Sequence, residues 1–387
     1  MWVATMLTIL GLLSVATITQ FTGYRLGGTI TVPILAVYTL KDLSLLPVFV
    51  LSTLTAYTGL WLFRRRTLVA GRDELVVAMV VGTTVPLAIF LLVDQVGLRS
   101  DVIVFFGSIL PGLAAYNYHQ IRPEYRRNDL AAAVTLFVGL LVIGWVLVTP
   151  AVAAQFGTLT PPVLFSRTAD IALLKNATAG ADVAPDVMAR EAVAVLFAAG
   201  LVLSERLRDR FGVRLGIITA VLLGIYALSN YWLLVLYLVL FVLAFGFVQA
   251  ANYATLRYGR VLFGLTAAVA MLLAIPFVLW FPITRGLSAF FVANIAGVTA
   301  YNAHVTPPFE RRLVLPLQVG VFVPSLLFAR LFSTPQPQGF THPVTLPVVV
   351  AGALLTAMAL GLAYWYSVDL PDRAAVRSAS VLPGGDS

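Results

Sequence analysis

Cysteine is absent from the 387-residue chain, which excludes disulfides, thiol catalysis and sulfur-ligated metal sites. Charge is scarce as well, since 11% of the residues are charged and 60% are hydrophobic. Lysine occurs only as Lys41 and Lys175, so the net charge of +8 rests on arginine. A soluble globular domain does not sustain such a composition. We therefore attribute the basic charge to membrane topology rather than to nucleic-acid binding.

The common catalytic signatures are missing too. The chain contains no HExxH, no GxSxG and no Walker-type glycine loop, and no polar stretch would build a soluble nucleotide-binding fold. No acidic residue is expected deep inside a helix, which disfavours a transporter coupled to protons or sodium ions. We expect this chain to hold no catalytic residue, no metal and no cofactor.

Long apolar runs are what the chain does contain, and its mean hydropathy is +0.95. Runs of about 20 apolar residues, or shorter ones interrupted by glycine and proline, recur from end to end. The sequence therefore predicts an all-α polytopic membrane protein with about 11–13 transmembrane or re-entrant helices. The first run, Met1–Gln20, lacks a charged leading region. We expect it to be a retained helix and not a signal peptide.

One polar-ended stretch occurs twice. Gly112–Arg127 reads GLAAYNYHQIRPEYRR, and Gly297–Arg312 reads GVTAYNAHVTPPFERR, so that half of the aligned positions are identical at an offset of 185. Further matches follow at offsets of 188 and 189, namely Arg25-Leu26-Gly27 with Arg214-Leu215-Gly216, Thr31 with Thr219, Tyr38 with Tyr226, and Arg72 with Arg260. Repetition in this order predicts that one membrane unit was duplicated and fused.

The duplication predicts the domain organisation. We expect a first membrane repeat, an extramembrane linker with a short surface helix, a second membrane repeat, a further linker with a final transmembrane helix, and a disordered cytoplasmic tail. Their predicted bounds are 1–149, 150–188, 189–331, 332–366 and 367–387.

Arginine predicts the orientation. If the N-terminus lies outside and every predicted segment crosses, the cytoplasmic loops hold 18 of the 25 basic residues. This asymmetry favours a multi-pass protein of the cell membrane with an outer N-terminus and a cytoplasmic C-terminus. Six crossings per repeat make the repeats parallel, so a pseudo-two-fold axis is expected along the membrane normal.

Four predicted segments are short and carry glycine, proline or asparagine: 26–42, 102–118, 213–229 and 286–301. We expect segment breaks at Gly27, Gly28, Pro33, Pro111, Gly112 and Gly297, because proline removes a backbone donor and such breaks belong beside a cavity or inside a bundle. The alternative is that these small residues only allow close helix packing.

The repeated polar residues are the candidates for substrate binding, and they all fall at the predicted cytoplasmic side. They are Arg25, Arg72, Asn117, His119, Arg126 and Arg127 in the first repeat, and Arg214, Arg260, Asn302, His304, Arg311 and Arg312 in the second. Guanidinium groups pair with carboxylates, so these residues would gather an anionic substrate. The alternative is that the arginines anchor the protein to anionic head groups and that the histidines and asparagines complete interfacial hydrogen bonds.

Three stretches of the first repeat resemble the PgsC/CapC family of poly-γ-glutamate (capsule) biosynthesis membrane proteins. They are the glycine and proline segment Leu26–Leu40, the helix start in Leu68–Gly82, and Gly107–Asn117, which reads GSILPGLAAYN. Family members are similar in length to the first repeat alone, so this chain resembles a tandem pair with an added terminal helix. The second repeat departs from the pattern at Asn294 and at Val221.

This resemblance implies a membrane subunit of a complex that makes and exports an anionic polymer. It also implies a separate cytoplasmic ATP-dependent amide ligase, other capsule-synthesis subunits and membrane lipid as partners, with no catalysis by this chain. Two other functions stay open at this point. One is a secondary transporter of a small anionic substrate, and the other is a membrane transferase with His119 as its base and Glu124 nearby.

Overall fold

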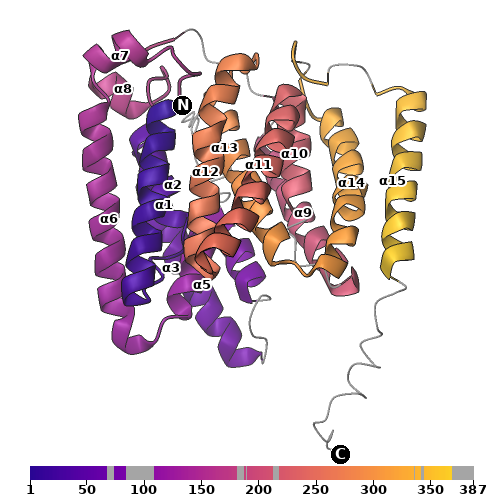
Figure 1. Cartoon of the computed structure of the whole chain (residues 1–387), viewed down its shortest axis with the longest axis horizontal. Helices are drawn as coiled ribbons and strands as arrows, with labels where there is room; N and C mark the ends of the chain where they lie inside the picture. Colours follow the sequence, from indigo (N-terminus) through magenta and orange to yellow (C-terminus); the bar gives the residue numbers. More distant parts are fainter. Residues whose placement is uncertain are drawn as a thin grey trace, which may run out of the picture.

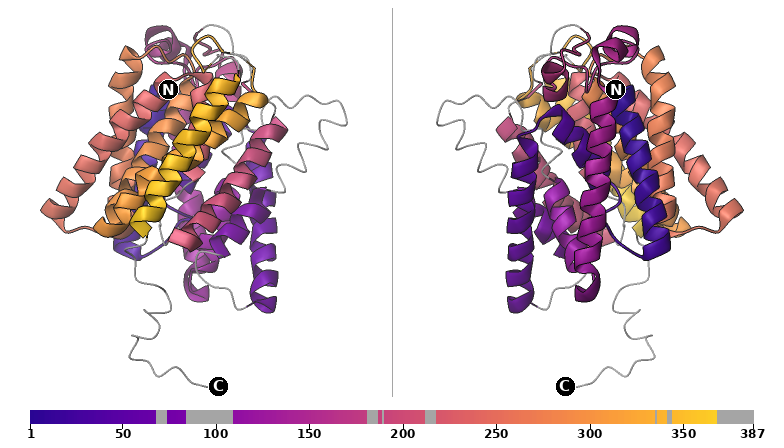
Figure 2. Two further views of the ribbon diagram at one scale, coloured as in Figure 1. Left: turned by 90° about the vertical axis from the view of Figure 1, so that its right-hand side faces the viewer. Right: turned by 90° about the vertical axis from the view of Figure 1, so that its left-hand side faces the viewer.

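The computed structural model describes residues 1–67, 74–83, 109–180, 187–188, 190–211, 218–334, 336–340 and 344–367. The described residues form a bundle of helices that run between two ends (Figures 1 and 2). We call one the N-terminal end, because Met1 lies there. The other is the arginine-rich end, where α1 finishes and where α5 meets α6.

The first half of the chain supplies helices of unequal length. The first three helices are long, short and long, and the final helix of this half is a long one that follows a 3-10 turn. The helices are α1 (Trp2–Thr22), α2 (Thr31–Lys41), α3 (Leu45–Arg66), an apolar helix over Glu74–Thr83, α5 (Ile109–His119), the turn η2 (Pro123–Tyr125) and α6 (Arg126–Leu147).

The second half follows the same sequence of lengths at its start, and one more long helix ends the described chain. Its helices are α9 (Arg190–Phe211), α10 (Ile218–Ser229), α11 (Trp232–Thr255), α12 (Gly259–Trp280), α13 (Gly286–Val305), α14 (Pro308–Leu331) and α15 (Leu346–Ser367). The described pieces hold one isolated β-bridge, between Met188 and Ser333.

Seven helices in the described part of the chain are long and apolar enough to cross a membrane: α1, α3, α6 with its preceding turn, α11, α12, α14 and α15. Tryptophan marks the ends of these helices, as expected at membrane–water interfaces. Trp2, Trp145, Trp232 and Trp280 lie toward the N-terminal end, whereas Trp61 and Trp365 lie toward the arginine-rich end. The prediction of an all-α polytopic membrane protein is confirmed.

Helix α2 lies at the centre of the bundle. All eleven of its residues are buried, although the helix is too short to span a membrane alone. Helices α1, α3, α5, α6 and α8 surround it. A short helix that follows a non-helical turn has to be buried in protein, because lipid cannot form hydrogen bonds with the backbone groups that the turn leaves unpaired.

Residues 150–180, which we call the cap segment, are a folded part of the bundle. The segment contains α7 (Pro150–Phe156) and α8 (Asp170–Leu174), and it buries Val163, Leu164 and Phe165 in the main core. The amino group of Met1 donates to the carbonyl of Pro161 at 2.7 Å, and the N–H of Trp2 donates to Thr160. The linker predicted for this region is therefore a close-packed cover over the N-terminal end (Figure 1).

Two of the predicted segment breaks are wrong. Gly297 lies inside the continuous helix α13, where an added Cβ would be 2.7 Å from Cα of Ala267 in α12. Gly112 also lies inside a helix, α5, and its Cβ would collide with the backbone of Ala78. Both glycines allow close packing, which was the alternative interpretation. Pro111 and Pro33 fall within the first turns of α5 and α2, where a missing N–H costs little.

Candidate functional site

The candidate site begins at the turn between α1 and α2. Three successive residues have left-handed backbone conformations, with φ of 51° at Leu26, 66° at Gly27 and 119° at Gly28. A side chain at Gly28 would also meet Thr31 Oγ1 at 2.8 Å and Asn117 Nδ2 at 3.0 Å. Glycine is needed there on both counts. The turn brings the chain from the end of α1 back into the bundle.

Asp129, in the first turn of α6, holds this turn in place. Its carboxylate oxygen Oδ1 accepts hydrogen bonds from the backbone N–H of Arg25 at 2.5 Å and of Leu26 at 3.0 Å. The residue is 1% exposed. No such buried acid was expected from the sequence. The equivalent position in the second repeat is Val314. This difference between the repeats was the one sequence feature that could have singled out Asp129.

A hydrogen bond joins the two halves of the chain beside the turn. Arg260 Nη2, in the first turn of α12, donates to Asn117 Oδ1 of α5 at 3.0 Å. Asn117 Nδ2 donates to the carbonyl oxygens of Leu113, at 2.8 Å, and Gly27, at 3.4 Å. Arg260 is repelled by Arg25 and attracted by Asp129. Two guanidinium groups and one carboxylate thus share a half-buried region.

A cavity of about 370 Å³ opens at the same turn, toward the arginine-rich end. It is lined by the end of α1 and by the connection between α5 and α6, through Thr22, Gly23, Tyr24, Arg25, Gln120, Ile121, Arg122 and Tyr125. Its charged lining residues are both arginines. We call the cavity, together with Asn117, Asp129 and Arg260, the turn site.

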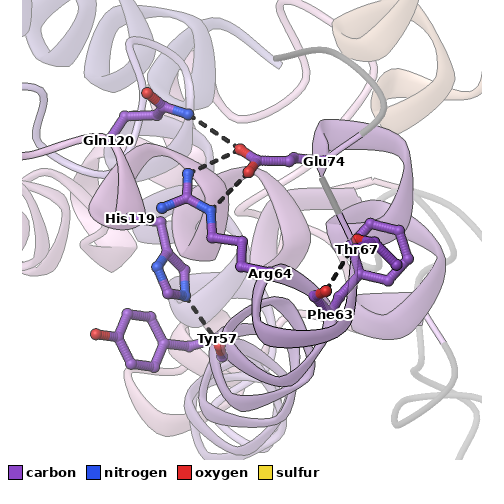
Figure 3. Close-up of polar contacts among 7 residues, drawn as sticks. All are labelled: Tyr57, Phe63, Arg64, Thr67, Glu74, His119 and Gln120. Carbon is purple, nitrogen blue, oxygen red and sulfur yellow. Dashed lines mark hydrogen bonds and ion pairs between the residues drawn. The ribbon is translucent and has the colours of Figure 1, made fainter. Parts of the chain in front are cut away.

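His119 belongs to a neighbouring network that is structural in its geometry (Figure 3). Its Nε2 lies 2.9 Å from the carbonyl oxygen of Tyr57 in α3, and the two rings stack with centroids 4.1 Å apart. Arg64 donates two hydrogen bonds to Glu74, at 2.6 and 2.8 Å, and Gln120 donates a third at 3.2 Å. Glu74, 4% exposed, is thereby fully engaged, and the network ties α3 and α5 to the helix at Glu74.

Arg126 and Arg311 have matching roles in the two halves. Arg126 Nε donates to the carbonyl of Ile121 at 3.2 Å, and Arg311 Nε donates to that of Thr306 at 2.8 Å. Each bond reaches back across the turn before α6 or α14. Arg311 also donates to the carbonyl of His304 at 2.7 Å. These two guanidinium groups brace turns, which leaves them less free for a ligand.

The remaining predicted residues lie apart from the turn site. Arg127 and Arg312 are exposed, and Asn302 is half-buried at the end of α13. Arg72 and Arg214 lie outside the described residues. Both repeated stretches end at the arginine-rich end, but in the described part of the chain no hydrogen bond or ring contact joins one directly to the other. The structure brings together Arg25, Asn117 and Arg260, and separately His119 with Arg126 around Tyr57.

Part of the first half of the chain is similar to a known protein family. Residues 10–127 match the family described as capsule biosynthesis CapC. The match therefore includes the later part of α1, all of α2, α3 and α5, and most of the turn site. No curated protein and no solved structure matches the chain. Over residues 10–127, the chain is therefore similar to the capsule biosynthesis CapC family.

Proposed function

We propose that this protein is a membrane subunit of a complex that synthesises and exports poly-γ-glutamate capsule, and that its turn site receives the anionic polymer. The family match supports a role in capsule biosynthesis. A separate cytoplasmic ATP-dependent amide ligase would make the polymer and deliver it to this subunit. Other capsule-synthesis subunits and membrane lipid complete the expected partners.

The observation that carries the proposal is the convergence of arginines from both halves on one turn. Arg25 and Arg122 line the cavity, and Arg260 crosses from α12 to bond Asn117 beside it. Guanidinium groups bind carboxylates in a planar, bidentate manner. Asp129 already occupies the backbone N–H groups of the turn, so a carboxylate ligand would bind the arginine side chains and not the backbone.

The proposal places the arginine-rich end in the cytoplasm. The described side chains at this end include Arg64, Arg65, Arg122, Arg127 and Arg312, and basic loops are retained on the cytoplasmic side. The N-terminal end with its cap segment would then face outward. A polymer made in the cytoplasm would meet the turn site first.

We also propose that the two halves arose by duplication and are parallel. Two matched contacts support this idea. Arg126 with Ile121 and Arg311 with Thr306 form the same hydrogen bond at equivalent positions of the two repeats. Gly112 against Ala78 and Gly297 against Ala267 make the same close approach. Helices α1 and α9 both start at the N-terminal end (Figure 1), as parallel repeats require.

A double substitution tests the function. Arg25→Gln with Arg122→Gln removes the two cavity charges and keeps polar side chains. We expect surface polymer to fall at least about tenfold at equal protein level, because several guanidinium contacts of about 1 kcal/mol or more are lost. Arg65→Gln is the matched control, since Arg65 lies at the same end but over the ring of Trp61.

Two results would count against the proposal. One is unchanged surface polymer in the double variant. The other is an equal loss in the Arg65→Gln control, which would make total charge, and not the turn site, the cause. Secondary transport of a small anion would instead appear as uptake that the same double variant lowers without any change in polymer.

A further inference from the structure

Asn294 of α13 is a buried polar side chain without a partner. It is 2% exposed, and among the described residues neither its carbonyl oxygen nor its amide nitrogen has a hydrogen-bond partner. Its counterpart in the first repeat is Ile109, so the first half has an apolar residue at this position. An unpaired carboxamide in a membrane bundle destabilises the fold. Packing alone therefore does not explain why asparagine occupies this position.

The helix geometry gives the direction of Asn294. Phe291, three residues earlier, stacks on Tyr38 of α2 with ring centroids 5.4 Å apart. Gly297, three residues later, faces Ala267 of α12. Since a helix turns by about 100° per residue, Asn294 lies between these two directions. It therefore faces the seam that α13 forms with Tyr38 of the first half on one side and Ala267 of α12 on the other.

Other unpaired groups are buried on α2. The hydroxyl groups of Tyr38 and Thr39, each in a residue 2% exposed, also lack partners among the described residues. Tyr226, which is the counterpart of Tyr38 in the second half, packs against the same core cluster that contains Tyr38. The seam between the halves thus contains the neutral polar groups of Asn294 and Tyr38, and Thr39 follows Tyr38 on α2.

The chemistry of this seam favours one class of ligand. A carboxamide offers one acceptor oxygen and a donor NH₂ group, so it can pair with the N–H and the carbonyl of another amide at once. A carboxylate would accept from the NH₂ group and leave the oxygen of Asn294 unpaired. The tyrosine and threonine hydroxyl groups can also both donate and accept.

We propose that Asn294, with Tyr38 and Thr39, forms a binding site for the amide groups of the polymer backbone inside the membrane. This inference rests on the proposed function, and it adds recognition of the amide linkage to recognition of the carboxylates. The arginines of the turn site would bind the carboxylates of the polymer at the arginine-rich end. The polar groups of the seam would bind its neutral amide backbone farther along α2. Binding requires α2 to move away from α13, which separates Tyr38 from Phe291.

The test uses the full-length protein purified in detergent and two probes of equal charge. One is a short γ-linked glutamate oligomer, and the other is an acrylate oligomer that has carboxylates but no amides. We expect the wild-type protein to bind the glutamate oligomer about tenfold or more tightly than the acrylate oligomer. Asn294→Leu should remove this preference and raise the midpoint of thermal unfolding without ligand, because the unpaired carboxamide is gone.

Controls separate this inference from the proposed function. Thr299→Val, on the same helix, removes a buried hydroxyl group that already bonds the carbonyl of Ile295, and it should keep the preference. Arg25→Gln with Arg122→Gln should weaken the binding of both oligomers to the same extent. If Asn294→Leu misfolds, Asn294→Ile, which introduces the residue of the first half, replaces it.

Four outcomes overturn the amide site. An Asn294→Leu protein that keeps the tenfold preference would show that the carboxamide binds water or nothing. A lower unfolding midpoint for both apolar variants would make Asn294 part of a structural network. Equal binding of the two oligomers by wild type, still weakened by the arginine variants, would refute amide recognition and leave the proposed function standing. Binding of neither oligomer would refute both.

Discussion

Arg260 and Asn117 lie 143 positions apart in the chain and are joined by a hydrogen bond of 3.0 Å from Nη2 to Oδ1. The bond crosses from the second half to the first, next to the left-handed turn at Gly27 and Gly28. One contact therefore couples the position of α12 to the shape of the turn site.

The coupling between Arg260 and Asn117 is measurable by a double-mutant cycle. Arg260→Gln and Asn117→Ala should each lower the free energy of unfolding, and their effects should fall short of additivity by about 1–2 kcal/mol, as for a hydrogen bond to a charged group. Arg257→Gln, close by in the chain and exposed, is the control. Strict additivity of the first pair would show that the bond contributes nothing.

Asp129 should be replaceable by asparagine but not by leucine. Asparagine keeps an oxygen for the N–H groups of Arg25 and Leu26, whereas leucine leaves two buried donors unpaired, which costs about 2–4 kcal/mol. The check is the thermal unfolding midpoint and folded yield of both variants in detergent. A leucine variant as stable as the asparagine variant would contradict the role assigned to the carboxylate.

Gly28 should tolerate no side chain. Gly28→Ala combines a φ of 119° with a Cβ only 2.8 Å from Thr31 Oγ1, and we expect a loss of about 1–3 kcal/mol. Gly361→Ala in α15, where nothing lies within 4 Å of an added Cβ, should be neutral or slightly stabilising. The two unfolding midpoints should therefore move apart, and equal midpoints would remove the steric argument.

The orientation in the membrane can be tested by labelling single introduced cysteines, because the chain has no cysteine of its own. Single cysteines at Thr158, in the cap segment, and at Asn128, beside the turn site, are both at exposed positions. A membrane-impermeant maleimide should label intact cells at position 158 and not at position 128. The reverse pattern would place the arginine-rich end outside and exclude polymer entry from the cytoplasm.

Hydropathy predicted the class of fold because a membrane imposes it. Only helices or closed barrels satisfy every backbone group in lipid, so long apolar runs such as those of α6, α11 and α12 leave little choice. The break expected at Gly297 was wrong for a local reason. Glycine in a membrane helix marks either a break or a close approach, and only the contact with Ala267 distinguishes the two.

The turn site was predicted in part. Repetition singled out Arg25, Asn117 and Arg260, because duplicated polar residues stand out in an apolar chain. Asp129 was missed because an acid in the first turn of a helix is ordinarily a surface residue. Its burial depends on the turn at Leu26 folding back onto α6, which no local pattern reveals.

The packing of the cap segment, too, could not be predicted from local sequence pattern. Residues 150–180 have no helical period and many small residues, which is typical of a linker. Their packing depends on Phe165 and Val163 meeting the start of α1, and on Asp170 accepting from the N–H of Leu43. Such contacts are set by tertiary structure.

Photo-crosslinking tests the central claim most directly, because it asks whether polymer occupies the turn site in living cells. A benzophenone amino acid at Tyr125, which lines the cavity, should form a covalent adduct with poly-γ-glutamate in cells that are making the polymer. The same amino acid at Tyr258, exposed in the turn between α11 and α12 and outside the cavity lining, should form none. An adduct at Tyr258 equal to that at Tyr125, or none at Tyr125 while surface polymer is being made, would contradict the account.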